Sequence, residues 1–590
     1  MKFLRELLAA ILGVFIAMGI MFVILMLFIS ASASAFGDDT KVTVKDNSVL
    51  ELNLESQIVD YAPKSSDPFA EIFDMEEGKM GLQQILNAIE NAKNDDKIKG
   101  ISINTLFVNA GMAQTQAVRD KLMEFKESGK FITAYADFYL QSNYYLSSVA
   151  DSVYVNPIGE IDFRGLSTEI LYYKDLQEKS GVKMEVIRHG KYKSAVEPFL
   201  EDKMSAANRE QVSSFLNSIW DEIVVDIADS RNKTISEVDA IADDLLARTP
   251  EMAINSNMID DLLFNDEYND KLKVLTGIEK DKKLNSVSIS DYISTGKGRI
   301  KSTASDKIAI IYAQGEIMYG KGSLDVIGQE KIIEALKKTR KNDKIKAIVL
   351  RVNSPGGSAL ASDLIWRELE LTKKEKPLVV SMGNYAASGG YYIACNADEI
   401  LAEPTTITGS IGVFGMIPNF SELTEDIGIN AEQVGTNKNS FAYSPFEPMT
   451  ESFYNVAKEG VEGIYKTFVG RVAEGRNMTE AEVDSIAQGR VWTGVEALEN
   501  GLVDKLGSLD DAVSRAAELA EVSDYSITNY PRYKTDFRDA LNPISFIKMS
   551  KENILKEELG VENYQIYKSI KDFANLKGVQ ARMPFEMKIK

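Results

Sequence analysis

The chain has 590 residues, more than one hydrophobic core normally supports, so we expect more than one domain. Its formal net charge of −21 argues against nucleic acid as a partner of the whole chain. The single cysteine, Cys395, excludes an internal disulfide and a cysteine-based metal cluster, and we expect it in the core. The single histidine, His189, excludes a multi-histidine metal site and leaves a Ser-His-Asp triad one possible base. We therefore expect neither a metal nor a cofactor.

The amino terminus carries an uncharged apolar run, residues 7–29, which is long enough to cross a bilayer. Two basic residues precede this run and two aspartates follow it, so the positive-inside tendency places the rest of the chain across the membrane from the cytoplasm. The small residues at 31–35 resemble a cleavage site, and a cleaved signal peptide is the alternative. We expect residues 1–35 to form a cytoplasmic tip and an uncleaved transmembrane anchor.

The sequence from about residue 45 to 540 contains an internal repeat. Residues 96–101 resemble residues 343–348, and residues 144–146 resemble residues 391–393, in both cases at an offset of 247 residues. Each copy alternates β-type runs with helical patterns, which is typical of an α/β fold with a largely parallel sheet. We expect the following parts: a first domain at 45–276, a polar linker at 277–305, a second domain at 306–535 and an extension at 536–590.

Ser388 lies in a run of small residues, 386–390, between a strand-like apolar run and an amphipathic helical segment. At such a corner a substrate backbone can approach the hydroxyl, and the start of the helix favours a developing oxyanion. Close packing of helix and strand is the alternative explanation. The first copy has Gln141 at the matching position, with Ser142 and Asn143 in place of the two glycines. Because glutamine is not small, we favour a functional serine.

A serine hydroxyl needs a base to act as a nucleophile. Three candidates, His189, Lys191 and Lys193, follow a strand-like run at 183–187 in the first copy. The matching part of the second copy, 435–448, lacks their pattern, which favours a base from one copy and a nucleophile from the other. A lysine serves as a base only where burial or nearby positive charge lowers its pKa toward neutrality. Solvated loop charges are the alternative role for both lysines.

Four motifs then carry a resemblance: K-Y-K-S-A-V-E-P-F at 191–199, N-S-P-G-G-S at 353–358, A-A-S-G-G-Y-Y at 386–392 and T-G-S-I-G-V-F-G at 408–415. In this order they resemble the long, duplicated form of the signal peptide peptidase A (protease IV) family. The resemblance covers about residues 45–530 and the anchor. It implies an α/β fold made of two Clp protease/crotonase-like domains in tandem, and a Ser-Lys dyad, which is a variant of the triad.

Carried over residue by residue, the resemblance assigns five site residues. Ser388 is the nucleophile, Lys193 is the general base, and Ser410 hydrogen-bonds and orients the lysine. The backbone N–H groups of Gly357 and Gly389 form the oxyanion hole. Ordinary tight turns are the alternative explanation for the glycine pair at 356–357 and for Ser410.

The resemblance implies a membrane-anchored serine endopeptidase that degrades cleaved signal peptides at the extracytoplasmic side of the membrane. It also implies a bowl-shaped homotetramer, located in the bacterial inner (cytoplasmic) membrane with its catalytic body in the periplasm. A crotonase-like acyl-CoA enzyme and a catalytically inactive membrane scaffold are the alternatives. The extension at 536–590 resembles the family weakly; it is either a peripheral helix pair or a tail that reaches a neighbouring subunit or the substrate groove.

Overall fold

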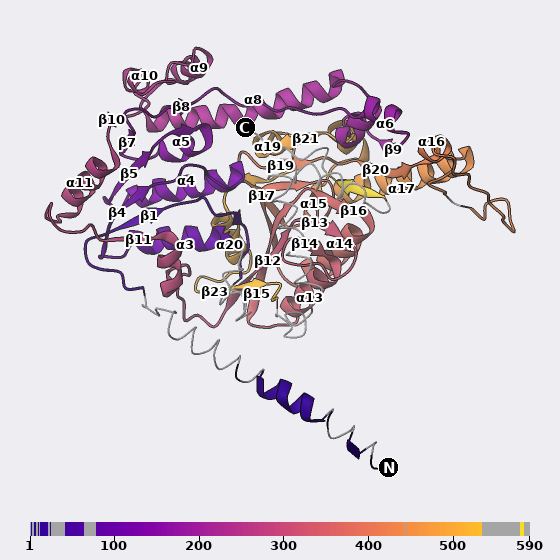
Figure 1. The fold of residues 1–590 in the computed structure, drawn as a ribbon, viewed down its shortest axis with the longest axis horizontal. Coiled ribbons are helices and arrows are strands. Elements are labelled where there is room, and N and C mark those ends of the chain that lie inside the picture. Colours follow the sequence, from indigo (N-terminus) through magenta and orange to yellow (C-terminus); the bar gives the residue numbers. More distant parts are fainter. Residues whose placement is uncertain are drawn as a thin grey trace.

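The computed structural model describes residues 42–63, 78–441, 443–533 and 579–582, together with residues 2, 5, 6, 10, 12–21 and 24 at the amino terminus. The two halves of the chain lie side by side, coloured indigo to purple and rose to orange in Figure 1. Each half is built on its own sheet, and a third sheet takes strands from both halves.

The amino-terminal half is built on a six-stranded sheet whose neighbouring strands are all parallel. Its order is β10 (Asp261–Leu262), β7 (Ser152–Val155), β5 (Phe131–Ala136), β4 (Ile98–Ile103), β1 (Ser48–Leu52) and β11 (Ser286–Ser288). Its larger helices are α3 (Leu82–Lys93), α4 (Met112–Lys126), α5 (Gln141–Ser147) and α11 (Asn265–Thr276). The stretch 277–305, predicted as a linker, contributes β11 to this sheet and holds the short helix α12 (Ile289–Tyr292).

The carboxyl-terminal half repeats this architecture around a sheet that is parallel except for β21, which is antiparallel to β19. Its order is β21 (Val491–Thr493), β19 (Ile407–Gly409), β17 (Leu378–Ala387), β15 (Ile345–Ser354), β12 (Lys307–Gln314) and β23 (Ser526–Tyr530). β18 (Glu399–Ala402) pairs with β17 and with β22 (Lys505–Leu506). Its larger helices are α13 (Gln329–Arg340), α14 (Ala359–Lys373) and α20 (Leu509–Leu519).

Corresponding helices of the two halves match residue by residue. Both α3 and α13, and likewise α4 and α14, begin and end 247 residues apart. In α3 the side chains of Ile85 and Ile89 are fully buried, because apolar residues three or four positions apart share one face of a helix. Cys395 is also fully buried, as predicted for a core residue. The predicted tandem α/β repeat is confirmed.

The third sheet joins the two halves. Its order is β14 (Val326–Gly328), β13 (Glu316–Met318), β16 (Gly356–Ser358), β24 (Gln580–Arg582), β20 (Val413–Asn419) and β9 (Lys183–His189). β9 leaves the amino-terminal half and pairs antiparallel with β20 along its whole length, from Lys183 opposite Asn419 to His189 opposite Val413. This pairing brings the residues after β9 into the carboxyl-terminal half.

Helix α8 (Ala206–Ser230) crosses the top of both halves in Figure 1, and the hydroxyls of Ser218 and Thr493 lie 2.7 Å apart. α17 (Glu451–Arg476) and α16 (Ser421–Asp426) lie on the right, where an orange loop extends away from the body. The remaining short elements are α6 (Lys174–Ser180), α7 (Glu197–Leu200), α9 (Ile235–Asp243), α10 (Pro250–Asn255), α15 (Gly389–Ala394), α18 (Glu480–Ile486), α19 (Gly494–Glu499), β2 (Ile58–Val59), β3 (Met80–Gly81), β6 (Tyr139–Leu140) and β8 (Ile161–Asp162).

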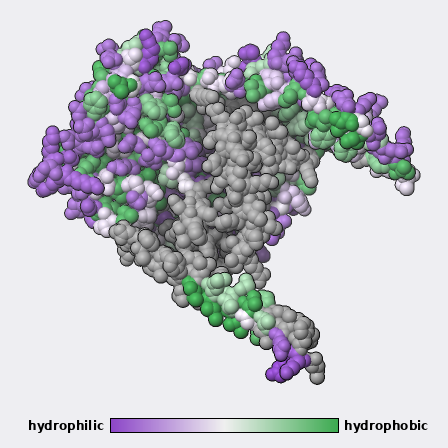
Figure 2. Space-filling view, viewed as in Figure 1, coloured by the Kyte–Doolittle hydropathy of each residue, from purple (hydrophilic) through white to green (hydrophobic). Residues whose placement is uncertain are grey.

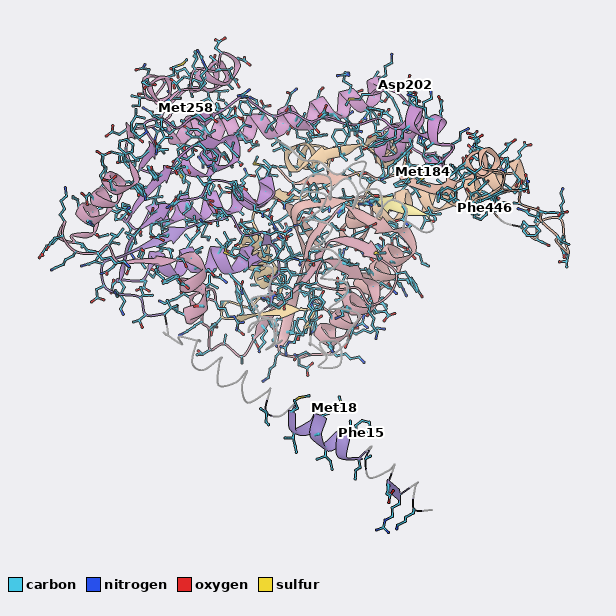
Figure 3. All side chains as sticks on the ribbon, viewed as in Figure 1. Phe15, Met18, Met184, Asp202, Met258 and Phe446 are labelled. Carbon is cyan, nitrogen blue, oxygen red and sulfur yellow. The ribbon has the colours of Figure 1, made fainter. Side chains whose placement is uncertain are left out.

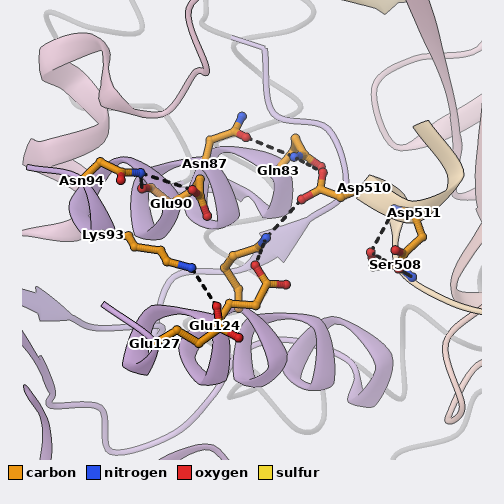
Figure 4. A network of polar contacts seen from close by, with 11 residues as sticks. Gln83, Asn87, Glu90, Lys93, Asn94, Glu124, Glu127, Ser508, Asp510 and Asp511 are labelled. Atoms are coloured by element: carbon orange, nitrogen blue, oxygen red, sulfur yellow. Dashed lines mark hydrogen bonds and ion pairs between the residues drawn. The ribbon is translucent and has the colours of Figure 1, made fainter. Parts of the chain in front are cut away.

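Polar contacts connect the halves directly. The Gln83 amide donates to the Asp510 carboxylate at 3.0 Å, a contact drawn in Figure 4. A second contact is an ion pair in which Arg351 Nη2 lies 2.9 Å from Asp60 Oδ1, and both side chains are 1% exposed. Arg351 also donates to the Ser381 hydroxyl at 2.8 Å. Each member of this ion pair belongs to a different half, so the pair couples their folding.

We expect Asp60→Ala to lower the free energy of unfolding by about 3–5 kcal/mol, because it leaves the buried guanidinium of Arg351 uncompensated. The double variant Asp60→Ala/Arg351→Met should recover most of this loss. Urea denaturation measures both. Lys93→Met, which removes an exposed ion pair with Glu127, is the control and should cost less than about 1 kcal/mol. A loss for Asp60→Ala no larger than the control would contradict coupling through this pair.

The predicted amino-terminal anchor lies largely outside the described residues. Residues 12–21 form a helix whose apolar side chains are exposed, including Phe15 and Met18 in Figure 3. Within the described part of the chain, no helix combines the length and the hydropathy that a membrane span needs. The predicted extension at 536–590 is described only at 579–582.

Candidate active site

Ser388 occupies the turn between strand β17 and helix α15. Its backbone has φ 55° and ψ −115°, a strained conformation for a residue with a Cβ. Its N–H donates to the Gly409 carbonyl oxygen at 2.8 Å, which holds the turn in place. The side chain is fully buried. The predicted strand-to-helix corner is present, and the turn fixes the direction of the hydroxyl.

Lys193 reaches this corner from the other half of the chain. After β9 the chain turns at Gly190, which has φ 114°. Two further glycines leave room for the lysine side chain: a Cβ on Gly489 would lie 2.7 Å from Lys193 Cβ, and one on Gly412 would lie 3.1 Å from its Cδ. Any larger residue at these two positions would displace the lysine.

The structure brings Lys193, Ser388 and Ser410 together. Lys193 Nζ lies 2.9 Å from Ser388 Oγ, 3.0 Å from Ser410 Oγ and 3.2 Å from the Ser410 carbonyl oxygen. All three residues are fully buried. Ser410 has φ 51°, and its N–H donates to the Arg490 carbonyl oxygen at 2.7 Å. This hydrogen bond holds the Ser410 backbone, and with it the carbonyl oxygen, beside the lysine.

Complete burial lowers the pKa of Lys193 well below its ordinary value, because desolvation disfavours the ammonium form. A neutral amine has two N–H donors and one lone pair. The two Ser410 oxygens can accept both donors, which leaves the lone pair to accept the Ser388 hydroxyl proton. The three contacts therefore suit a lysine that acts as a base toward Ser388.

The other two candidate bases have different surroundings. The His189 ring packs on Tyr465 with the ring centroids 4.0 Å apart. Lys191 is exposed, and its Nζ lies 4.9 Å from the centroid of the Tyr192 ring. Of the three candidates, Lys193 is the one that contacts Ser388.

Gly357 and Gly389 place two backbone nitrogens next to each other beside Ser388. A Cβ on Gly389 would lie 3.2 Å from the Gly357 nitrogen, and one on Gly356 would lie 2.8 Å from the Gly389 nitrogen. Gly356 and Gly357 have φ of 101° and 151°, which residues with a side chain rarely adopt. The bare backbone gives an oxyanion access to both N–H groups.

The sequence matches peptidase family S49 over residues 124–279 and 370–523, and the ClpP-like SDH-type serine proteinases over residues 299–425. The chain belongs to peptidase family S49. It is 35% identical to Protease 4 of Haemophilus influenzae over 528 residues, which are 86% of this chain and 85% of that protein. Protease 4 of Salmonella typhi is 37% identical over 459 residues, 76% of this chain and 74% of that protein. The chloroplastic serine protease SPPA of Arabidopsis thaliana is 31% identical over 549 residues, 92% of this chain and 78% of that protein.

Membership of family S49 makes the protein a serine peptidase with two ClpP-like domains in tandem. These relatives confirm the resemblance to signal peptide peptidase A (protease IV) that the four motifs indicated. The acyl-CoA enzyme and the inactive scaffold, which were the alternatives, are not supported.

In the first S49 half, the corner that matches Ser388 is filled. The Gln141 side-chain oxygen accepts from the backbone N–H groups of Arg164 and Gly165 at 3.1 and 2.8 Å. Phe163, which is buried, occupies the position that matches Ser410 at the offset of 247 residues. The first half therefore has neither serine at its own corner, and its Lys193 lies at the corner of the second half.

The sequence alone did not single out Gly412 and Gly489, the two glycines whose lack of a side chain leaves room for the lysine side chain. Gly412 lies inside the T-G-S-I-G-V-F-G motif, where it reads as one more small residue. Gly489 has φ 82°, and its nearest neighbours are the backbone and Cβ of Lys193. Their role depends on a contact between residues far apart in the sequence, so no local pattern indicates it.

In this S49 peptidase we expect Gly357→Ala to lower kcat about 10²–10³-fold, the usual cost of losing an oxyanion-hole donor. The added Cβ would overlap the Ile317 carbonyl oxygen, so the Gly357 N–H must move. Steady-state peptide hydrolysis measures the loss. Gly129→Ala is the control, because Gly129 also has a positive φ, 75°, but no atom near its Cβ position. An unchanged kcat for Gly357→Ala would remove this N–H from the oxyanion hole.

Proposed function

We propose that the protein is a Ser-Lys endopeptidase with Ser388 as nucleophile, Lys193 as general base and Ser410 as the residue that orients the base. The observation that carries this proposal is the buried contact of 2.9 Å between Lys193 Nζ and Ser388 Oγ. A serine hydroxyl is a weak nucleophile until an adjacent base accepts its proton. A lysine held neutral by burial meets that need without a histidine.

In the proposed reaction, Ser388 Oγ attacks the peptide carbonyl carbon while Lys193 Nζ takes the hydroxyl proton. The N–H groups of Gly357 and Gly389 stabilise the negative charge that forms on the carbonyl oxygen. The C–N bond breaks as Lys193 passes its proton to the leaving nitrogen. Water, deprotonated by Lys193, then hydrolyses the acyl ester. The two Ser410 oxygens stabilise the ammonium form of the lysine between these steps.

We further propose that the substrates are short, apolar peptides, in particular signal peptides that remain after secretion. A relative from Enterococcus faecium, 35% identical over 216 residues, or 36% of this chain, is named putative signal peptide peptidase SppA.

A fluorophosphonate probe followed by peptide mass spectrometry tests the dyad. We expect the label on Ser388 of the wild type and its loss in Lys193→Met, with hydrolysis of a synthetic apolar signal peptide lost in parallel. Lys191→Met, which changes a neighbouring exposed lysine, should keep both. Full labelling of Lys193→Met, or a label on another serine, would contradict the assignment.

We also propose that residues 7–29 anchor the protein in the bacterial inner membrane with the body in the periplasm. The uncharged apolar run and the exposed apolar side chains of residues 12–21 support this proposal. Cell fractionation should find the full chain in the membrane pellet, and protease added to spheroplasts should digest the body. A body protected from that protease would contradict the orientation.

For the assembly, we propose a closed ring of identical chains, the homotetramer, in which a strand of one chain completes a sheet of the next. Within one chain, β9 pairs with β20. At the offset of 247 residues, 430–436 match β9 and 166–172 match β20. In the described structure neither of these two segments is paired as a strand. By the symmetry of the repeat, 430–436 of one chain would pair with 166–172 of its neighbour.

The helix and the glycine that precede β9 have counterparts before residues 430–436. α6 ends at Gly181 with φ 65°, and α16 is followed by Gly428 with φ 79°, in matching positions. Beyond Gly428, Ile429 is 55% exposed and Val434 is 90% exposed. Figure 2 shows an apolar patch on the right, where the loop leaves the body, and a mixture of hydrophilic and hydrophobic residues along the loop. A neighbouring chain would bury these side chains.

A disulfide trap tests this register. Ile187 of β9 lies opposite Gly415 of β20, so Val434 should lie opposite Thr168 of the next chain. We expect Thr168→Cys/Val434→Cys to give covalent multimers up to the tetramer on non-reducing gels. Each single variant should stay monomeric there, because the native Cys395 is buried. Absence of multimers in the double variant would contradict the pairing.

A further inference from the structure

Helix α8 of the amino-terminal half carries a buried amide, Gln211, next to the segment that holds Lys193. The Gln211 amide nitrogen lies 3.1 Å from the Tyr192 carbonyl oxygen and 2.7 Å from the Ser194 hydroxyl oxygen. These two residues flank Lys193 in the chain. Gln211 is fully buried, and burying an amide is costly unless hydrogen bonds satisfy it. Its N–H groups therefore hold the backbone of the proposed base from both sides.

The oxygen of the same amide reaches the carboxyl-terminal half. The Val491 N–H donates to the Gln211 side-chain oxygen at 3.4 Å. This N–H and the Arg490 carbonyl belong to one peptide group, and the carbonyl accepts from the Ser410 N–H at 2.7 Å. Because a peptide group is planar and rigid, it fixes Gln211 and Ser410 relative to each other. The contacts close a ring, since Lys193 Nζ lies 3.2 Å from the Ser410 carbonyl oxygen.

A second buried amide determines which end of Gln211 faces which half. Asn208 lies one turn before Gln211 on α8, and its side-chain nitrogen donates to the Glu197 carboxyl group. A carboxylate accepts hydrogen bonds and does not donate them, so the Asn208 oxygen must point the other way. This oxygen lies 3.0 Å from the Gln211 nitrogen. Gln211 therefore presents its nitrogen to the Lys193 segment and its oxygen to Val491.

Glu197, Asn208 and Gln211, here called the α8 relay, connect α8 to the K-Y-K-S-A-V-E-P-F motif. The side chains of Ser194 and Glu197 are 4% and 2% exposed, and each binds one amide of α8. The Glu197 carboxyl group also accepts at 3.3 Å from the N–H of Ser205, which caps the amino-terminal end of α8. The motif therefore contains the proposed base together with the groups that fix this helix against it.

We propose that the α8 relay, through Gln211, sets the separation between Lys193 and Ser410. This inference rests on the proposed function of Lys193 as the base. A lysine side chain is a flexible four-carbon stem, so its backbone and its acceptor must both be held to keep Nζ 2.9 Å from Ser388 Oγ. A displacement of about 1 Å at a reacting group costs about 10²-fold in rate. Gln211 is a positioning residue that acts through the lysine.

Peptide hydrolysis by Gln211→Met tests the proposal, because methionine is similar in length and has no amide. We expect kcat to fall about 10–100-fold while KM changes less than about twofold, since the relay acts on the reaction step and not on peptide binding. The rate at which a fluorophosphonate labels Ser388 should fall in the same proportion. A loss that comes from KM alone would overturn the proposal.

Ser218→Ala is the matched control. It removes another contact between α8 and the carboxyl-terminal half, the one of 2.7 Å between the Ser218 and Thr493 hydroxyls. Its kcat and labelling rate should stay within about twofold of the wild type. A Gln211→Met protein with the same kcat as this control would show that the relay is structural, and would overturn the proposal.

Ser194→Ala covers the case in which Gln211→Met does not fold, because it removes one acceptor of the Gln211 amide and little volume. We expect kcat to fall about three- to tenfold, the equivalent of one hydrogen bond. A kcat equal to that of Ser218→Ala would again overturn the proposal. The two proposals fail differently: a wrong dyad leaves Lys193→Met fully labelled, whereas a wrong relay leaves Lys193→Met unlabelled and Gln211→Met labelled at the wild-type rate.

Discussion

Ser388→Ala is expected to lower kcat/KM for peptide hydrolysis by about 10⁴-fold or more, because the acyl ester can no longer form. The double variant Ser388→Ala/Lys193→Met should be no less active than either single variant, since nucleophile and base act as a unit. Product formation from a synthetic signal peptide, followed by chromatography, measures all three. Losses that multiply in the double variant would mean that the two residues act independently and would contradict the dyad.

Lys193→Met is expected to lower kcat/KM as far as Ser388→Ala does and, at neutral pH, to raise the free energy of unfolding. Methionine fills the same buried channel without the cost of desolvating an amine. If the lysine were needed only for packing, its replacement would not lower kcat/KM while raising the free energy of unfolding. Lys191→Met, at an exposed position, should change neither quantity. A Lys193→Met protein that is less stable than the wild type at every pH would contradict the buried neutral lysine.

The pH dependence of stability follows from the same lowered pKa. In the folded protein the pKa of Lys193 lies well below its ordinary value, whereas in the unfolded chain it is close to about 10.4. Between these two values the unfolded chain binds more protons, so the stability of the wild type rises with pH across that window. Lys193→Met should lack this rise. Urea midpoints compared across the window measure the difference.

The pH dependence of activity has the same origin. Protonated Lys193 cannot accept the Ser388 proton, so kcat/KM of the wild type should fall as the pH drops through the pKa of Lys193 and reach a plateau above it. Hydrolysis rates measured at a low concentration of substrate give this profile. A rate that rises toward acid pH would contradict a lysine base.

The corner at Ser388 and the tandem repeat were predictable because each is encoded in a short stretch of sequence. Apolar runs, small residues and helical spacing predict a strand, a turn and a helix without reference to the rest of the chain. The position of Lys193 was not predictable in this way. Its lowered pKa depends on burial beneath Gly412 and Gly489, which lie more than 200 residues away in the sequence. The family resemblance, rather than any local pattern, selected it from three candidates.

The polar stretch 277–305 shows where composition misleads. Its lysines, aspartates and serines indicated a connection between domains, yet β11 within it pairs with β1 at the edge of the first sheet. An edge strand of three residues needs only one buried side chain, here Val287, so its composition remains polar. The strand β24 escaped prediction for a related reason, because its three residues have no periodicity and are held by backbone pairing.

The pairing of β9 with β20 makes the order of synthesis matter. Domains fold as units during translation, starting from the amino terminus. A ribosome adds Lys193 almost two hundred residues before it reaches Ser388. Under the proposed Ser-Lys mechanism, a chain that stops short of Ser388 holds the lysine without its serine and is expected to have no peptidase activity. The proposed mechanism therefore makes the first proteolysis wait until parts of both halves have been synthesised and have paired.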